Sequence, residues 1–153
     1  EVLDRDGKGT RKYVGAIDEA FAEMGNVSLY EGRLPENGDE IAMDLPALAA
    51  MGYSYDLGQT ISIGVQTDEY GNIARKEFKL VGTIRSFASN WITDSSHPLP
   101  SCIVTEEGLE AVGGTFNRVW FYQLDRVSGY RYRRIYSAVS EERASVYIQS
   151  VCI

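Results

Sequence analysis

Residues 29–63 read LYEGRLPENGDEIAMDLPALAAMGYSYDLGQTISI. The segment contains a turn-rich entry at 31–39, an apolar strand pattern at 40–44, a small-residue helix pattern at 45–51 and a second strand from Gln59. Glycine and proline break regular structure before the first strand, and glycine does so again after the helix, because these residues favour turn conformations. The sequence therefore predicts strand, helix and strand in this order.

The strand-helix pattern occurs twice more, at residues 13–25 and 102–114. Each copy has a short apolar strand, a polar helix start, a short helix of small residues and a glycine stop. We expect Asp18, Asp44 and Thr105 at the N-caps, where their side chains accept hydrogen bonds from the first helical N–H groups. The irregular spacing between copies excludes a solenoid. Related building blocks and chance recurrence of a common motif both remain open.

A β-hairpin is expected between the second and third copies. Apolar and polar residues alternate over 60–66 and 77–85, so each strand has one face for a core, and residues 68–72 form the turn. The N-terminal end is interpreted as another hairpin, from Val2–Leu3 to residues 13–17. Together these elements predict an α+β fold, with a mixed sheet and short helices in a compact domain of one or two lobes.

The C-terminal part is predicted less regularly. Residues 117–124 are strongly β-prone and are interpreted as a central strand, and residues 140–145 are interpreted as the start of a helix that runs toward Ile153. Residues 130–136 alternate aromatic and basic side chains. That pattern is typical of single-stranded nucleic-acid binding, but it equally describes a strand with two different faces.

Composition limits the kind of partner. The chain has 153 residues and a net charge of −7, which argues against nucleic acid, since phosphates require a basic surface. The sequence holds no apolar run of about 18 residues that would span a membrane. Its two cysteines, Cys102 and Cys152, are compatible with one disulfide or with two small buried side chains, and both alternatives remain open.

The order of several motifs resembles the extracytoplasmic, periplasmic-core-like domain of MacB/FtsX-type ABC transporter permeases. The motifs are EGRLPENGDEI at 31–41, LGQTISI at 57–63 and FKLVGTI at 78–84. The resemblance covers residues 29–85 well and residues 101–124 more loosely. No single motif is as specific as a zinc-ligand spacing, so the weight lies in their order.

The resemblance implies that residues 1–153 form a single extracytoplasmic domain, cut from a longer membrane protein and placed on the outer side of the cell membrane. Such a domain is non-catalytic. It contacts a transported substrate or a partner and moves with the transmembrane helices of the same chain. The implied partners are those helices, an ATP-binding domain or subunit, a second copy in a homodimer, and an extracellular protein or peptide.

The residues themselves predict no catalytic, cofactor or metal site. His97 is the single histidine, and the sequence has no zinc-ligand spacing, no nucleophile motif and no glycine-rich phosphate loop. Adjacent carboxylates such as Glu106 and Glu107 read as helix-start charges. We therefore expect that the chain is not an enzyme, although a hydrolase assembled from distant carboxylates is a third hypothesis.

The loop at residues 86–100, SFASNWITDSSHPLP, is the predicted partner-binding segment. Its candidate contacts are Trp91, Ile92 and His97, because an exposed tryptophan anchors many protein interfaces. The alternative is that Trp91 folds back as a lid over the hairpin. This loop also supports a second function, a free-standing secreted module that binds a peptide or a carbohydrate.

Overall fold

The computed structural model describes residues 2–3, 9–10, 12–66, 73–86, 99–113, 119–123 and 145–149. The chain divides into two compact units, Glu1–Thr115 and Phe116–Ile153. That residues 1–153 form a single extracytoplasmic domain stays a prediction.

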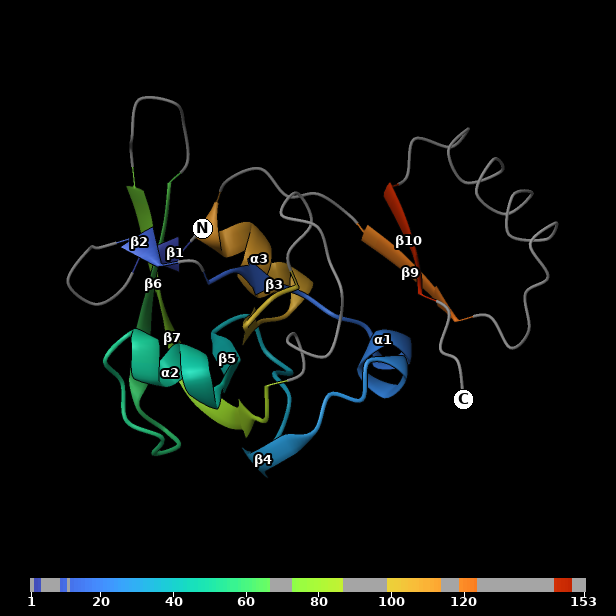
Figure 1. Cartoon of the computed structure of the whole chain (residues 1–153). Coiled ribbons are helices and arrows are strands. Elements are labelled where there is room, and N and C mark those ends of the chain that lie inside the picture. The colour runs from blue at the N-terminus through green and yellow to red at the C-terminus, as the bar shows by residue number, and fades with distance from the viewer. Residues whose placement is uncertain are drawn as a thin grey trace, which may run out of the picture. The chain divides into compact units, whose positions relative to one another are not determined.

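A mixed β-sheet forms the centre of the first unit (Figure 1). Among the described residues, its order is β2 (Gly9–Thr10), β1 (Val2–Leu3), β6 (Thr60–Gln66), β7 (Ile73–Ile84), β5 (Glu40–Asp44), β8 (Cys102–Ile103) and β3 (Val14–Gly15). A further strand, β4 (Leu29–Gly32), pairs with β7 beside this path. The pairs β5–β7 and β8–β3 are parallel and the others antiparallel. The predicted α+β class with a mixed sheet is confirmed.

Three short helices follow the predicted strand-helix pattern: α1 (Glu19–Met24), α2 (Leu45–Ala50) and α3 (Glu106–Val112). Each has the expected N-cap. The backbone N–H groups of Phe21, Ala47 and Gly108 donate to the side chains of Asp18 at 2.7 Å, Asp44 at 2.6 Å and Thr105 at 3.1 Å. These bonds satisfy N–H groups that have no partner inside the helix, which explains why such short helices begin where they do.

The core lies between the sheet and helices α2 and α3. It consists of Ile41, Met43, Ala47, Leu48, Met51, Ile61, Ile63, Phe78, Leu80, Cys102, Val104 and Val112. Ile61 and Ile63 of β6 face this core together with Phe78 and Leu80 of β7. The one-sided apolar alternation predicted for this hairpin is therefore confirmed.

The N-terminal hairpin differs from the prediction. β1 pairs with Gly9–Thr10, and residues 13–17 take no part in that pairing. Val14 instead lies opposite Cys102 in the parallel pair β3–β8, and the N–H groups of Ser101 and Cys102 both donate to the Tyr13 carbonyl at 3.0 Å. Val14 also packs against the core, so burial places this short strand beside β8.

The second unit contains two described strands, β9 (Val119–Gln123) and β10 (Ser145–Gln149), which pair in parallel along five residues each. A strand within residues 117–124 is confirmed, but its predicted central position is wrong for the described part, where β9 has one neighbour. The helix predicted from residue 140 toward Ile153 is also wrong, because residues 145–149 form a strand. Their sequence, SVYIQ, contains β-branched and aromatic residues that favour strands. Residues 130–136 lie outside the described residues.

Candidate interaction surface

One of the two neighbours of β7 changes along the strand, from β6 to β4. Lys79 is opposite both Thr60 of β6 and Glu40 of β5, so these two strands flank β7. Toward the C-terminal end of β7, β5 is still paired on one side, but β4 replaces β6 on the other side. Backbone hydrogen bonds continue where β4 replaces β6 as the neighbour of β7. The Gly58 N–H donates to the Leu80 carbonyl at 2.7 Å, and the Arg33 N–H donates to the Val81 carbonyl at 3.0 Å.

Two glycines make this change of neighbour sterically possible. Gly32 lies directly opposite Gly82 in the β4–β7 pair. A Cβ atom on Gly82 would collide with the Arg33 carbonyl, and one on Gly32 would collide with the Val81 carbonyl. Gly32 also has a φ of +80°, which side-chain-bearing residues rarely adopt. The glycine in each of the motifs EGRLP and LVGTI is therefore explained by a close approach of two backbones.

The turn that follows β4 is closed by a hydrogen-bonded ion pair. The Arg33 guanidinium donates to both carboxylate oxygens of Glu40, and the backbone N–H groups of Glu36 and Asn37 donate to Glu40 Oε2 at 2.9 and 3.2 Å. The bond from Arg33, followed by those from the backbone, lowers the pKa of Glu40 to about 2. Glu40 is only 8% exposed. These contacts assign Arg33 and Glu40 a structural role.

Strand β4 contains a β-bulge at Tyr30. Leu29 lies opposite Ile84 and Glu31 lies opposite Thr83, so Tyr30 is an additional residue on β4. Bulges at sheet edges redirect side chains and terminate pairing. Tyr30 is 59% exposed as a result of its position on this edge.

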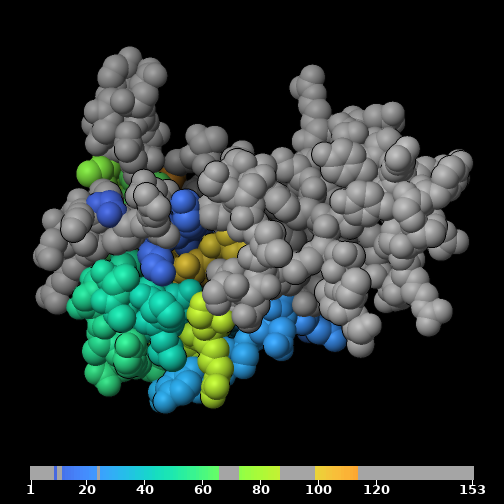
Figure 2. Space-filling model, in the orientation of Figure 1, coloured from blue at the N-terminus to red at the C-terminus, as the bar shows by residue number. Residues whose placement is uncertain are grey.

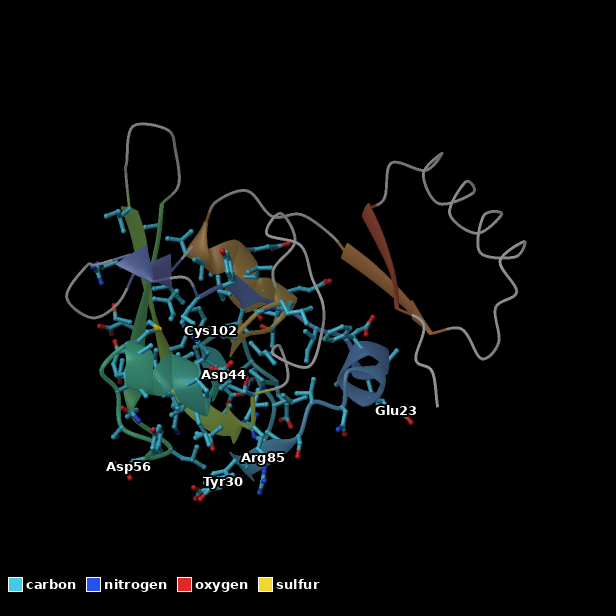
Figure 3. All side chains as sticks on the ribbon, viewed as in Figure 1. Glu23, Tyr30, Asp44, Asp56, Arg85 and Cys102 are labelled. Atoms are coloured by element: carbon cyan, nitrogen blue, oxygen red, sulfur yellow. The ribbon has the colours of Figure 1, made fainter. Side chains whose placement is uncertain are left out.

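Arg85 lies over the exposed tyrosine. Its guanidinium carbon is 5.8 Å from the centre of the Tyr30 ring, within the range of a cation–π contact, and the two side chains lie together at the end of β7 in Figure 3. The Arg85 N–H donates to the Ser28 carbonyl at 2.9 Å, which extends the β4–β7 pairing by one bond. The backbone thus fixes both members of the pair.

An apolar side chain from another loop lies beside β4. A Cβ atom on Gly32 would be 3.0 Å from Leu57 Cδ1, so Leu57 covers the glycine, and it is 36% exposed. The Gln59 side-chain amide donates to the carbonyls of Ser54 and Asp56, both at 2.8 Å, and the Ser54 hydroxyl bonds to the Asp56 carboxylate at 2.9 Å. These bonds hold the loop that presents Leu57.

We call Leu29, Tyr30, Leu57 and Arg85 the Tyr30 surface. In the space-filling view, the yellow-green atoms that include the end of β7 lie beside the blue segment that includes β4, at the lower rim of the face shown (Figure 2). The exposed large apolar residues of the described part are Leu29, Tyr30, Tyr55, Leu57 and Ile73. Three of these five belong to the Tyr30 surface and Tyr55 is in the same loop as Leu57, so exposed apolar side chains concentrate here.

The predicted partner-binding residues Trp91, Ile92 and His97 lie outside the described residues, so their role stays a prediction. The Tyr30 surface was not predicted from the sequence. Leu29 and Tyr30 come just before the segment 31–39 that was interpreted as a turn-rich entry, and Arg85 was placed at the end of the predicted hairpin strand. Nothing in the string LYEGR predicts a bulged edge strand beside that hairpin. The sequence signal that could have indicated this surface is Tyr30, an aromatic residue just before the Gly32–Arg33 turn.

The interior near Cys102 has a structural role. The Cys102 thiol is free and wholly buried, and burial raises its pKa to about 12, so it behaves as a small apolar side chain. Burial also raises the pKa of Asp44, although the Ala47 N–H partly stabilises the carboxylate. Cys152 lies outside the described residues.

Within the described ranges, no three histidine, cysteine or carboxylate side chains come together in a way that could hold a metal ion. None of the helices in the described part has the length and apolar character needed to cross a membrane.

Comparison with known proteins gave one structural likeness. No family model matches the chain, and no curated protein matches it. Its fold is similar to the crystal structure of the periplasmic region of MacB from Actinobacillus actinomycetemcomitans, with a TM-score of 0.48 and 12% sequence identity over 94% of this chain. The chain spans 63% of the length of that structure. A likeness this distant assigns no function by itself.

Proposed function

We propose that this chain is an extracytoplasmic domain of a MacB/FtsX-type ABC transporter permease. The observation that carries the proposal is the order of its elements: a strand, a turn, a second strand, a helix and a hairpin. The elements β4, β5, α2, β6 and β7 follow one another in this order between Leu29 and Ile84, where the sequence resembles that family.

The roles of the motif residues support the proposal. Gly32 and Gly82 allow two backbones to meet, Arg33 and Glu40 close the turn, and Asp44 caps α2. Each residue therefore specifies a feature of the scaffold. A resemblance in such residues is a resemblance in architecture, so the proposed function rests on analogy with the family.

In this function the domain does no covalent chemistry. It lies on the outer side of the membrane, contacts a substrate or a partner protein, and moves with transmembrane helices of the same chain. ATP is hydrolysed by a separate domain or subunit on the other side. A homodimer would bring two such domains together.

The coding sequence on both sides of this segment tests the proposal. We expect an apolar run of about 20 residues shortly before Glu1 and another beyond Ile153, since that length spans a bilayer. A cleavable leader upstream together with a stop codon soon after Ile153 would contradict the proposal. The free-standing secreted binding module would then be the better interpretation.

A topology reporter gives a second, independent test. Alkaline phosphatase folds into an active enzyme only outside the cytoplasm, because it needs disulfides. We expect activity when it is inserted after Gly113 in the complete gene product and no activity when it is fused to the ATP-binding part. Activity in neither fusion, with both proteins expressed, would place this domain in the cytoplasm and refute the proposal.

A further inference from the structure

We propose that the Tyr30 surface binds a partner protein that presents a carboxylate beside an apolar side chain. The inference rests on the proposed function in one respect, namely that the partner meets the domain outside the cytoplasm. It adds to that function the place of contact and the chemistry that is recognised.

The Tyr30 surface exposes three large apolar side chains. Leu29, Tyr30 and Leu57 are 38%, 59% and 36% exposed, and the contact of Leu57 with Gly32 places it against β4. Tyrosine and arginine are enriched at the energetic centres of protein interfaces, where a partner removes them from water. Exposed apolar side chains around an arginine and a tyrosine have the composition of a protein-binding site.

Charge selects the kind of partner. The ion pairs found among the described residues involve Arg33, so Arg85 keeps an unpaired positive charge beside the exposed Tyr30 ring. Glu31 is exposed on β4, next to Tyr30, but forms no ion pair with Arg85. A guanidinium held over an aromatic ring is weakly hydrated and binds a carboxylate through two parallel hydrogen bonds. The complementary group is therefore an anion.

The Tyr30 surface is also held in place before any partner arrives. The backbone bond between Arg85 and Ser28 and the side-chain bonds of Gln59 fix the two segments that carry it. Side chains that are ordered beforehand lose less conformational entropy on binding.

Side chains, and not an added strand, make the contact. β4 has four residues and carries a bulge, and both features oppose pairing with a further strand. The partner therefore meets Tyr30 and Arg85 from their exposed side. A second copy of this chain is the rival occupant, and the experiment below distinguishes it.

The test is an NMR titration of the 153-residue chain, labelled with 15N, against acetyl-Leu-Glu-Leu-amide as the probe. The matched control is acetyl-Leu-Lys-Leu-amide. We expect amide shifts at residues 29–32, at Leu57 and at Arg85 with the glutamate peptide at millimolar concentration. The lysine peptide should bind about fivefold more weakly, as exchanging an attractive for a repulsive exposed charge implies.

Two variants make the test specific. Arg85→Glu should reverse the preference between the peptides, and Tyr30→Ala should weaken both. Arg75→Glu is the matched control, because Arg75 is exposed like Arg85 but lies within β7, opposite Gly64 of β6. It should leave the preference unchanged. Amide spectra of all three variants establish that each is folded.

Several results would overturn the inference. These are equal binding of both peptides, no binding of either, shifts confined to other residues, or the same effect from Arg75→Glu. Self-association that depends on concentration and is lost in Arg85→Glu would identify a second copy as the occupant. None of these results bears on the flanking coding sequence, so the permease proposal fails or holds separately.

Discussion

Strands β4 and β5 share a neighbour but have opposite environments. β4 places Gly32 and Glu31 opposite Gly82 and Thr83 of β7, and β5 places Ala42 and Met43 opposite the same two residues from the other side. Yet all five residues of β5 are buried and all four residues of β4 are exposed. Pairing to a common strand therefore does not decide burial.

What covers each strand makes the difference. β5 lies between β7 and β8, and its Ile41 and Met43 pack into the core that α2 helps to form. β4 pairs, among the described strands, with β7 alone. Central strands of this kind specify a fold, whereas an edge strand is free to supply a surface.

The largest expected effect tests the stabilising role of β5. Ile41→Ala should lower the free energy of unfolding by about 4 kcal/mol, because it leaves a cavity in a wholly buried position. Leu29→Ala on β4 is the comparison and should cost less than about 1 kcal/mol, because Leu29 is already partly in water. Chemical denaturation measures both, and equal losses would remove the distinction between the strands.

The next effect tests the close approach of β4 to β7. Gly32→Ala should lower the free energy of unfolding by about 3 kcal/mol, since it adds a backbone clash to an unfavourable φ. Gly52→Ala is the matched control. Gly52 has nearly the same φ, +78°, but a Cβ atom there meets nothing within 4 Å, so about 1 kcal/mol is expected. If the two variants unfold at the same denaturant concentration, the backbones of β4 and β7 are farther apart at Gly32 than the structure shows.

A smaller effect concerns Thr83, which both strands face. Its hydroxyl is wholly buried and has no hydrogen-bond partner among the residues that the structure describes. Thr83→Val replaces the hydroxyl by a methyl group of similar size, so we expect a gain of about 1 kcal/mol in the free energy of unfolding. Thr83→Ser keeps the polar group and serves as the control, with no gain expected. A destabilised Thr83→Val variant would mean that the hydroxyl does have a partner.

The smallest effect is a change in acid sensitivity at the turn between the strands. The folded-state pKa of Glu40, about 2, lies below its ordinary value of 4.5. The carboxylate therefore stabilises the fold above pH 4.5, and this contribution is lost as the pH falls from 4.5 toward 2. We expect Glu40→Gln to show a shallower loss of melting temperature over that range.

Glu36→Gln is the control for this prediction. The Glu36 carboxylate also faces the Arg33 guanidinium, but it is exposed and lies 3.8 Å away, so its interaction is weak. It should follow the parent protein. Parallel acid curves for the parent and Glu40→Gln would contradict the stabilising role of the carboxylate.

The sequence by itself determined the local elements. Asp18, Asp44 and Thr105 cap helices because a side-chain oxygen and an N–H group three residues later are neighbours in any conformation that starts a helix. The alternation around Ile61 and Phe78 fixed which face of the hairpin is apolar. Both signals act within a few residues, so they can be read along the chain.

Only the tertiary structure decided which strands are neighbours. Val14 lies opposite Cys102, 88 positions away by residue number, and β10 is a strand although a helix was predicted there. The bulge at Tyr30 likewise depends on how β4 meets β7, and it creates a surface that the sequence did not reveal. A residue pattern shows which face of a strand is apolar, but the neighbour is selected by the burial and register that the whole sheet can satisfy at once.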